Sequence, residues 1–403
     1  MKSIKSLNKF DIVCFFLALL FALILLPSNL KSIGILLFGI SVLLLTFNRK
    51  KYFNTSFFLL NTIFFFGIIF TLFYTSNHAY ATRKLLTMSS LLVFPFLFSL
   101  FNSADRKKIS KNKNLFLSIY IVSVFLFNTV IFLWFYLTHY SFSDIVYHFH
   151  RVIMVDLGKF GIHPIYLSIH CCLAILFSAF IYKPIQNKNL KLILVFINIV
   201  LMFFLIIYAR KGPLLAIIIT SLLWVLSENK KNVKLKIISI ISLSLLLFLI
   251  PKTRNRFSEI FTINNSKSIE SNSFGIRLVI YKNASELIKE SPFFGYGIGD
   301  YNDTLKESYK KNNPSLEVYY NSHNQYISFF LIGGLFLLLL YFIFLYSNVK
   351  IAIKKRNVHS LIILCFYSIV MLSENILERE NGVIFFSFFL CFFSLNNYTK
   401  DEQ

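Results

Sequence analysis

Two arginines and one histidine stand out by their positions beside apolar or amphipathic stretches. Arg210 follows one run, Arg277 opens an amphipathic stretch, and His323 precedes another run. A charge at such a place is costly unless it faces protein, water or a phosphate. A guanidinium group binds phosphate oxygens two at a time, and histidine can exchange a proton near neutral pH. These residues indicate a site for a phosphate-bearing substrate, although snorkelling of Arg210 and a structural role for His323 are the alternatives.

Other polar constellations give weaker signals. His148 and His150, with His163 nearby, have a spacing that zinc could use, but no carboxylate or cysteine set stands at ligand spacing. All five cysteines lie inside apolar runs, which is typical of small hydrophobic filler. The alternate glycines in 295–299 lack the strand–turn–helix context of a nucleotide loop and favour a turn. We therefore expect no metal ion and no cofactor.

Composition places the chain in a membrane. Of its 403 residues 56% are hydrophobic and 15% are charged, with a mean hydropathy of +0.67. A soluble domain carries roughly a quarter charged residues. The formal charge of +23 comes from short lysine and arginine clusters between apolar runs, as is usual beside membrane spans. Nucleic-acid binding is disfavoured, because no soluble domain is present to display a basic surface.

The apolar runs predict an all-α polytopic membrane protein with about twelve transmembrane helices and one long extracytoplasmic loop. The basic segment before the first run is similar to a signal peptide, but no small-residue cleavage site follows, so we expect this run to remain a span. The expected spans are 10–27, 32–48, 55–74, 85–101, 115–138, 164–182, 191–208, 213–227, 237–251, 325–347, 359–373 and 383–395.

The distribution of basic residues predicts the orientation. With the N-terminus in the cytoplasm, the inside segments hold 23 lysines and arginines and the short outside loops hold eight. Such a bias puts both termini in the cytoplasm. The sequence then divides into nine helices over 1–251, an extracytoplasmic catalytic loop over 252–322, and three helices with a short cytoplasmic tail over 323–403.

The sequence pattern predicts one short helix inside the long loop. From Arg277 to Glu290 the apolar residues recur at helical spacing, and Pro292 ends the pattern. We expect this helix to lie on the membrane surface with its apolar face toward the lipid. That face consists of Ile280, Ala284, Leu287 and Ile288.

From about 208 to 339 the chain resembles the O-antigen ligase and polymerase family. Three ordered elements carry the resemblance. They are Ala-Arg-Lys-Gly-Pro at 209–213, the loop helix that Arg277 opens with Ser-Pro-Phe-Phe-Gly-Tyr-Gly-Ile-Gly at 291–299, and Ser-His-Asn-Gln-Tyr at 322–326 with paired glycines at 333–334. Lys211 is a departure, since the family often has a small residue after the first arginine.

The resemblance implies an inverting membrane glycosyltransferase that uses an undecaprenyl-diphosphate-linked glycan and needs neither nucleotide sugar nor metal. Arg210 and Arg277 would hold the donor diphosphate, and His323 would orient or deprotonate the acceptor hydroxyl. The residues expected to contact substrate are Lys211, Tyr281, Gly297 and Asn324.

The leading hypothesis is a ligase at the outer face of the inner membrane that moves a finished glycan to a lipid A–core acceptor. A polymerase that joins lipid-linked repeat units is the first alternative, because both enzymes use the same kind of donor. A transporter or a flippase of lipid-linked glycans is the second. Transporters usually place charges at the membrane midplane, whereas these spans are nearly free of charge.

Overall fold

The computed structural model describes residues 8–47, 49, 52–227, 254, 273–313 and 320–398, and every regular element in these ranges is helical. Seven of the described helices are long and apolar enough to cross a membrane, and three further apolar helices are shorter: Lys211–Ser227, Val358–Met371 and Glu380–Ser394. The all-helical membrane class is confirmed, whereas the count of about twelve stays a prediction, and the expected span 237–251 lies outside the described residues. The seven helices long and apolar enough to cross a membrane are Ser28–Thr46, Thr55–Phe73, His78–Ser99, Lys113–Thr138, Pro164–Tyr182, Lys188–Tyr208 and Gln325–Lys354.

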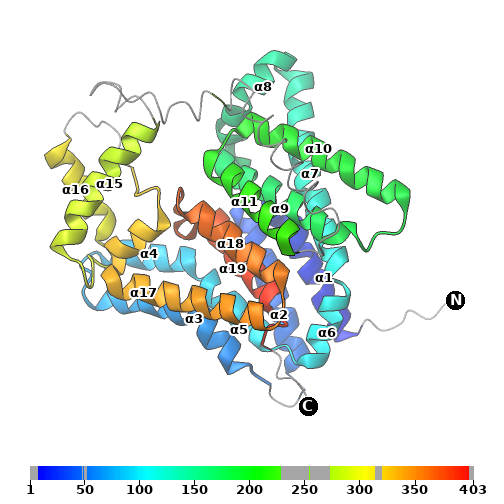
Figure 1. Ribbon diagram of the computed structural model, residues 1–403, viewed down its shortest axis with the longest axis horizontal. Helices are drawn as coiled ribbons and strands as arrows, with labels where there is room; N and C mark the ends of the chain where they lie inside the picture. Colours follow the sequence, from blue (N-terminus) through cyan, green and yellow to red (C-terminus); the bar gives the residue numbers. More distant parts are fainter. Residues whose placement is uncertain are drawn as a thin grey trace. The chain divides into compact units, whose positions relative to one another are not determined.

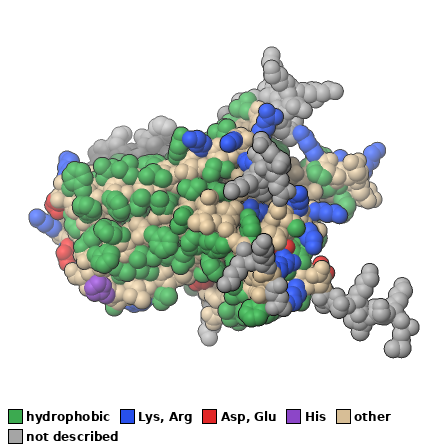
Figure 2. Space-filling model, turned by 90° about the horizontal axis from the view of Figure 1, so that it is seen from below, with side chains coloured by type: hydrophobic (Ala, Val, Ile, Leu, Met, Phe, Trp, Pro, Cys, Tyr) green, Lys and Arg blue, Asp and Glu red, His purple; other side chains and the backbone are tan. Residues whose placement is uncertain are grey.

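The chain forms two compact units. The first comprises residues 1–54 and 97–217, and its most enclosed helix is α9, which packs against α7 and α10. Many apolar side chains of the neighbouring helices are exposed, which suits contact with lipid, and hydrophobic side chains also cover much of the molecular face shown in Figure 2. The helices of this unit are α1 (Lys9–Ala22), α2 (Ser28–Thr46), α6 (Ser103–Lys111), α7 (Lys113–Thr138), α8 (Phe142–Arg151), α9 (Pro164–Tyr182), α10 (Lys188–Tyr208) and the start of α11 (Lys211–Ser227) (Figure 1).

The second unit comprises residues 55–96 and 218–403. In this unit α17 packs along α3 and against α18, and α18 packs against α19. Its helices are α3 (Thr55–Phe70), α4 (His78–Met88), most of α5 (Ser90–Ser99), α15 (Ser273–Glu290), α16 (Tyr301–Asn312), α17 (Gln325–Lys354), α18 (Val358–Met371) and α19 (Glu380–Ser394) (Figure 1).

Helix α17 is broken at Gly333 and Gly334, which have non-helical backbone angles. A break leaves backbone groups without partners inside the helix. The turn 291–299, which we call the glycine turn, supplies these partners. The amides of Tyr296 and Gly297 donate to the carbonyls of residues 331 and 332 at 2.8 Å each, and the amide of residue 335 donates to the Pro292 carbonyl at 2.8 Å.

The glycine turn is also fastened to the segment that follows α3. The Gly299 amide donates to the hydroxyl of Thr75 at 2.8 Å, and the Ile298 amide donates to that of Thr71 at 3.1 Å. Asp300 accepts the backbone amides of residues 76 and 77 at 2.6 and 2.8 Å. The alternate glycines therefore form a docked turn, as the sequence indicates.

Helix α15 covers the residues expected to form a helix, but its environment corrects one expectation. Its residues Ile280, Ala284 and Leu287 are buried, and α15 packs against α16 and α17. The apolar face is thus covered by protein and does not lie on lipid, because an apolar stripe fits either partner equally well. The extracytoplasmic placement of this helix stays a prediction.

Helix α16 was not predicted from the sequence. Its buried face consists of Tyr301, Leu305 and Tyr309, at a spacing of four residues. Between these positions the helix is rich in lysine and acidic residues, so its sequence has the composition of a polar loop. A polar contact joins it to α15, since Ser308 donates to the Asn283 amide oxygen at 2.8 Å.

Candidate functional site

The second unit brings two of the three predicted catalytic residues into one cluster with the turn that follows α18. Arg277 lies in the first turns of α15 and donates to the backbone carbonyl of Ser373 at 3.1 Å. His323 Nδ1 lies 4.0 Å from a carboxylate oxygen of Glu374. Arg277 and Arg379 are both close enough to His323 to act on its charge. We call this cluster the arginine–histidine site: Arg277, His323, Glu374, Glu378 and Arg379.

The backbone at His323 has an unusual conformation that its surroundings maintain. His323 has a φ of +47°, which a residue other than glycine adopts only when its surroundings hold it there. Its amide donates to the Asn321 side chain at 3.2 Å, and the Asn324 side chain caps α17 by accepting the Tyr326 amide at 2.9 Å. The imidazole is 29% exposed, and its ring centroid lies 6.0 Å from that of Tyr320.

A buried network lies beneath this site. Asn375 donates to a Glu378 carboxylate oxygen at 2.8 Å and to the hydroxyl of Ser322, the residue before His323, at 3.0 Å. The second Glu378 oxygen accepts the Tyr301 hydroxyl at 2.5 Å and lies 3.6 Å from Lys84 Nζ. The Glu378 side chain is 3% exposed. Lys84 comes from α4 and Tyr301 from α16, and Asn375 connects the carboxylate to Ser322, so this network ties together the elements that carry the site.

The surroundings of His323 lower its pKa and so change how it can act as a base. Burial, reinforced by Arg277 and Arg379, lowers the pKa of His323 from 6.5 to about 4, and Glu378 opposes the shift. The imidazole is therefore neutral at pH 7. A neutral ring accepts a hydrogen bond well, but it is a weaker base than a free histidine.

The lowered pKa predicts an unusual acid limit. If neutral His323 is needed for turnover, activity should persist below pH 6 and fall as the pH approaches about 4. Folding favours the neutral form, so the stability contributed by His323 is complete above about pH 6.5 and declines as the pH falls toward 4. A profile of kcat/KM against pH measures this limit. An acid limb near 6.5 that disappears in His323→Gln would contradict the prediction.

The remaining predicted catalytic residue belongs to the first unit. Helix α10 ends at Tyr208, its C-cap Ala209 has a left-handed φ of 46°, and the next residue is Arg210. The Arg210 carbonyl accepts the amide of Leu214, so that Lys211 begins α11 directly. A joint site of Arg210 and Lys211 with Arg277 stays a prediction.

The other expected substrate contacts differ in how available they are. Tyr281 lies one helical turn after Arg277 on α15 and is partly exposed. The side-chain oxygen of Asn324 caps α17, and its amide nitrogen would be the group to reach a substrate. The Gly297 amide already donates to the Ile332 carbonyl, so this amide is not offered to a phosphate.

Glu374 and Arg379 are site residues that sequence reasoning missed. They lie in the charged segment between α18 and α19. The available signal was the placement of ionisable residues at the ends of spans, which had singled out Arg210 and His323.

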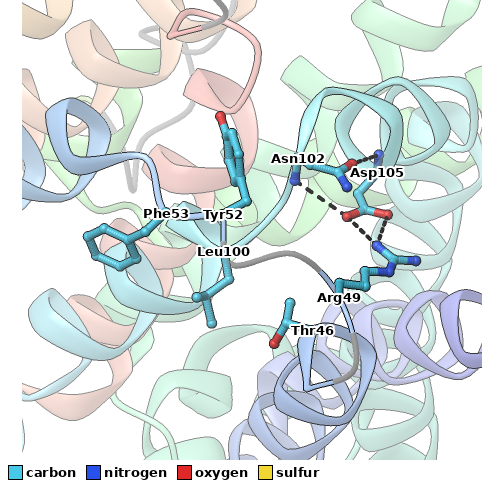
Figure 3. A pocket seen from close by; sticks show the side chains of 7 residues that line it. All are labelled: Thr46, Arg49, Tyr52, Phe53, Leu100, Asn102 and Asp105. Carbon is cyan, nitrogen blue, oxygen red and sulfur yellow. Dashed lines mark hydrogen bonds and ion pairs between the residues drawn. The ribbon is translucent and has the colours of Figure 1, made fainter.

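The first unit carries a separate polar pocket, which contains none of the predicted site residues. Its lining comes from the end of α2 and the link that follows it, from the residue after α5, and from the start of α6 (Figure 3). In the described part of the chain no group of three or more histidine, cysteine or acidic residues could hold a metal ion. His148 and His150 thus have no described third ligand.

The fold and the arginine–histidine site define a polytopic helical membrane protein with ionisable side chains gathered at the ends of its spans. The family model described as O-antigen ligase matches residues 195–342 and confirms the resemblance that the three motifs carry. This stretch contains Arg210, Arg277 and His323 and covers a little more than a third of the chain. No curated protein matches the chain.

Proposed function

We propose that this protein is an O-antigen ligase, which transfers a glycan from undecaprenyl diphosphate to a lipid A–core acceptor at the outer face of the inner membrane. The family match implies ligase-like or polymerase-like activity. The observation that carries the proposal is the position of Arg277 and Arg379 beside neutral His323, just ahead of the span α17. Such a site offers cations for a diphosphate next to an acceptor for a hydroxyl proton.

The reaction uses the site as follows. The acceptor hydroxyl oxygen attacks the anomeric carbon on the face opposite the diphosphate, which inverts that carbon. The bond from carbon to the diphosphate oxygen breaks, and its electron pair stays on the diphosphate. Arg277, with Arg210, binds the oxygens on which negative charge grows, and such preorganised donors stabilise the transition state. Binding the diphosphate in this way requires arginine side chains that the protein holds in place.

His323 orients the acceptor. Its neutral imidazole accepts a hydrogen bond from the hydroxyl before reaction. As the new bond forms, the hydroxyl becomes strongly acidic, so that even a base of low pKa can take its proton. Glu374, 4.0 Å from Nδ1, is placed to stabilise the imidazolium that results.

The same proposal includes the topology. Both termini lie in the cytoplasm, and the loop 252–322 lies outside, where lipid-linked glycans await transfer. The donor, the acceptor and the lipid bilayer are the partners, and the protein needs no metal and no cofactor.

The polymerase alternative shares the donor, and a gene deletion separates it from the ligase. Deletion of a ligase should leave lipid A–core without long chains and should increase long glycans on the carrier lipid. Cores that carry a single repeat unit would instead indicate a polymerase. An unchanged surface ladder together with an unchanged lipid-linked pool would contradict both and favour a transporter or flippase. Both pools are measured in the same cells, with the gene restored on a plasmid as the control.

A further inference from the structure

The pocket of the first unit is a cavity of about 280 Å³ with one charged wall and one apolar wall. Arg49, Asn102 and Asp105 form the charged wall, as Figure 3 shows. Tyr52, Phe53 and Leu100 stand on the other side, and Thr46 lies at its base (Figure 3). A cavity of this kind suits a ligand with a charged head and an apolar body.

Hydrogen bonds connect the side chains of the charged wall to one another. The Arg49 Nη1 donates to both oxygens of Asp105 at 2.9 Å. Asp105 is itself part of a capping box, in which its amide donates to the Asn102 side chain at 2.9 Å. The remaining donors of Arg49 are therefore preorganised, and less entropy is lost when they bind an anion.

The surroundings are strongly positive despite the acidic partner. Arg106 is buried beside the pocket and donates to the Tyr52 hydroxyl at 2.9 Å, which fixes the aromatic wall. Helix α6 also displays exposed lysines, Lys107, Lys108 and Lys111. With Arg49 these are five cations against the carboxylates of Asp105 and of Asp11, which acts on Cys14 together with Lys108 and Asp105, so the field favours an anion.

The pocket lies where candidate spans end. Thr46 is the last residue of the span Ser28–Thr46, and Leu100 directly follows the span His78–Ser99. Phe53, 40% exposed, lies two residues before the start of the next span. The ends of spans meet the headgroup region of a bilayer, where phosphates and the first acyl carbons lie side by side.

We propose that this pocket binds the phosphate of an anionic phospholipid, with Arg49 on the phosphate and with Tyr52, Phe53 and Leu100 against the glycerol and first acyl carbons. Lipid held there would join the link between α2 and α3 to the start of α6. This site is independent of the proposed transfer reaction, and none of its residues belongs to the arginine–histidine site.

The test measures lipid retention by the purified full-length protein. Phosphatidylglycerol is titrated into detergent-solubilised protein, and bound lipid is counted by native mass spectrometry. Arg49→Gln should weaken retention of one lipid about tenfold, the scale of a lost charge-assisted contact. Thr46→Phe should do the same, because its ring fills the cavity while the Arg49–Asp105 pair remains. Arg356→Gln, which removes an exposed arginine of another basic cluster, is the matched control and should retain lipid normally.

Two results would overturn the proposal. One is retention in Thr46→Phe equal to that of the unmodified protein, which decides the matter even if Arg49→Gln fails to fold. The other is competition by inorganic phosphate or glycerol 3-phosphate without specific lipid retention, which would make the pocket a site for a water-soluble phosphate. Loss in Thr46→Phe with normal retention in Arg356→Gln supports the lipid assignment.

Discussion

Replacement of Arg277 by alanine is expected to abolish glycan transfer, and replacement by lysine is expected to restore little of it. Removal of one preorganised donor from a site of developing negative charge costs on the order of 10²–10³ in kcat. Lysine keeps the charge but loses the planar fork that holds two phosphate oxygens, and it cannot reach Ser373 and a substrate at once. The measurement is transfer from purified lipid-linked glycan to lipid A–core in proteoliposomes.

The control for Arg277 lies on the same helix. Lys289→Ala removes an exposed cation from the last turn of α15 and should leave transfer unchanged. Because Arg277 also bonds to the Ser373 carbonyl, thermal unfolding of each variant must be compared with that of the unmodified protein. Full transfer by Arg277→Ala would remove this residue from the proposed mechanism.

The second large effect is expected at Gly334, where alanine should prevent a stable fold of the second unit. A Cβ there would lie 2.2 Å from the Phe293 carbonyl carbon and 2.4 Å from two further backbone atoms. Gly334 also has a φ of +60° and a ψ of −156°, a region open essentially to glycine alone. Backbone cannot swing aside as a side chain can, so the glycine turn would have to leave the break in α17. We expect destabilisation of roughly 3 kcal/mol or more, from strain and crowding together.

Gly158 offers a matched control for this glycine. It too has a positive φ, of +54°, but a Cβ there meets nothing within 4 Å. Gly158→Ala should therefore cost only the conformational strain, roughly 1–2 kcal/mol. Thermal unfolding in detergent, followed by circular dichroism, compares the two variants. Equal unfolding temperatures for Gly334→Ala and Gly158→Ala would show that the docked turn is not needed for stability.

The helices could be predicted where composition alone decides them. Long apolar runs indicated α7, α9 and α10 within a few residues, because hydrocarbon demands both apolarity and length. Helix α16 was not predicted, because its apolar stripe is narrow and its other residues are polar. The packing of α15 against α16 and α17 could not be predicted either, since the sequence shows that a helix face is apolar and does not show what covers this face.

The candidate site could be proposed from the sequence to the extent that residue types reveal chemistry. Arg277 and His323 stood out because they are ionisable residues close to spans, and the structure places them in one cluster. Glu374 and Arg379 did not, because their approach depends on how the turn after α18 returns to the start of α17. The lowered pKa of His323 has the same origin, for it arises from neighbours distant in the sequence.

The break in α17 has a consequence for how the protein is made. Open backbone groups in hydrocarbon cost several kcal/mol each, so the half-helix 325–332 and the half that follows cannot settle in the bilayer as independent pieces. The glycine turn that closes the gap is synthesised earlier, and the segment 71–77 that receives this turn is synthesised earlier still. We therefore expect α17 to complete its insertion only by closing onto a turn that has been synthesised before it.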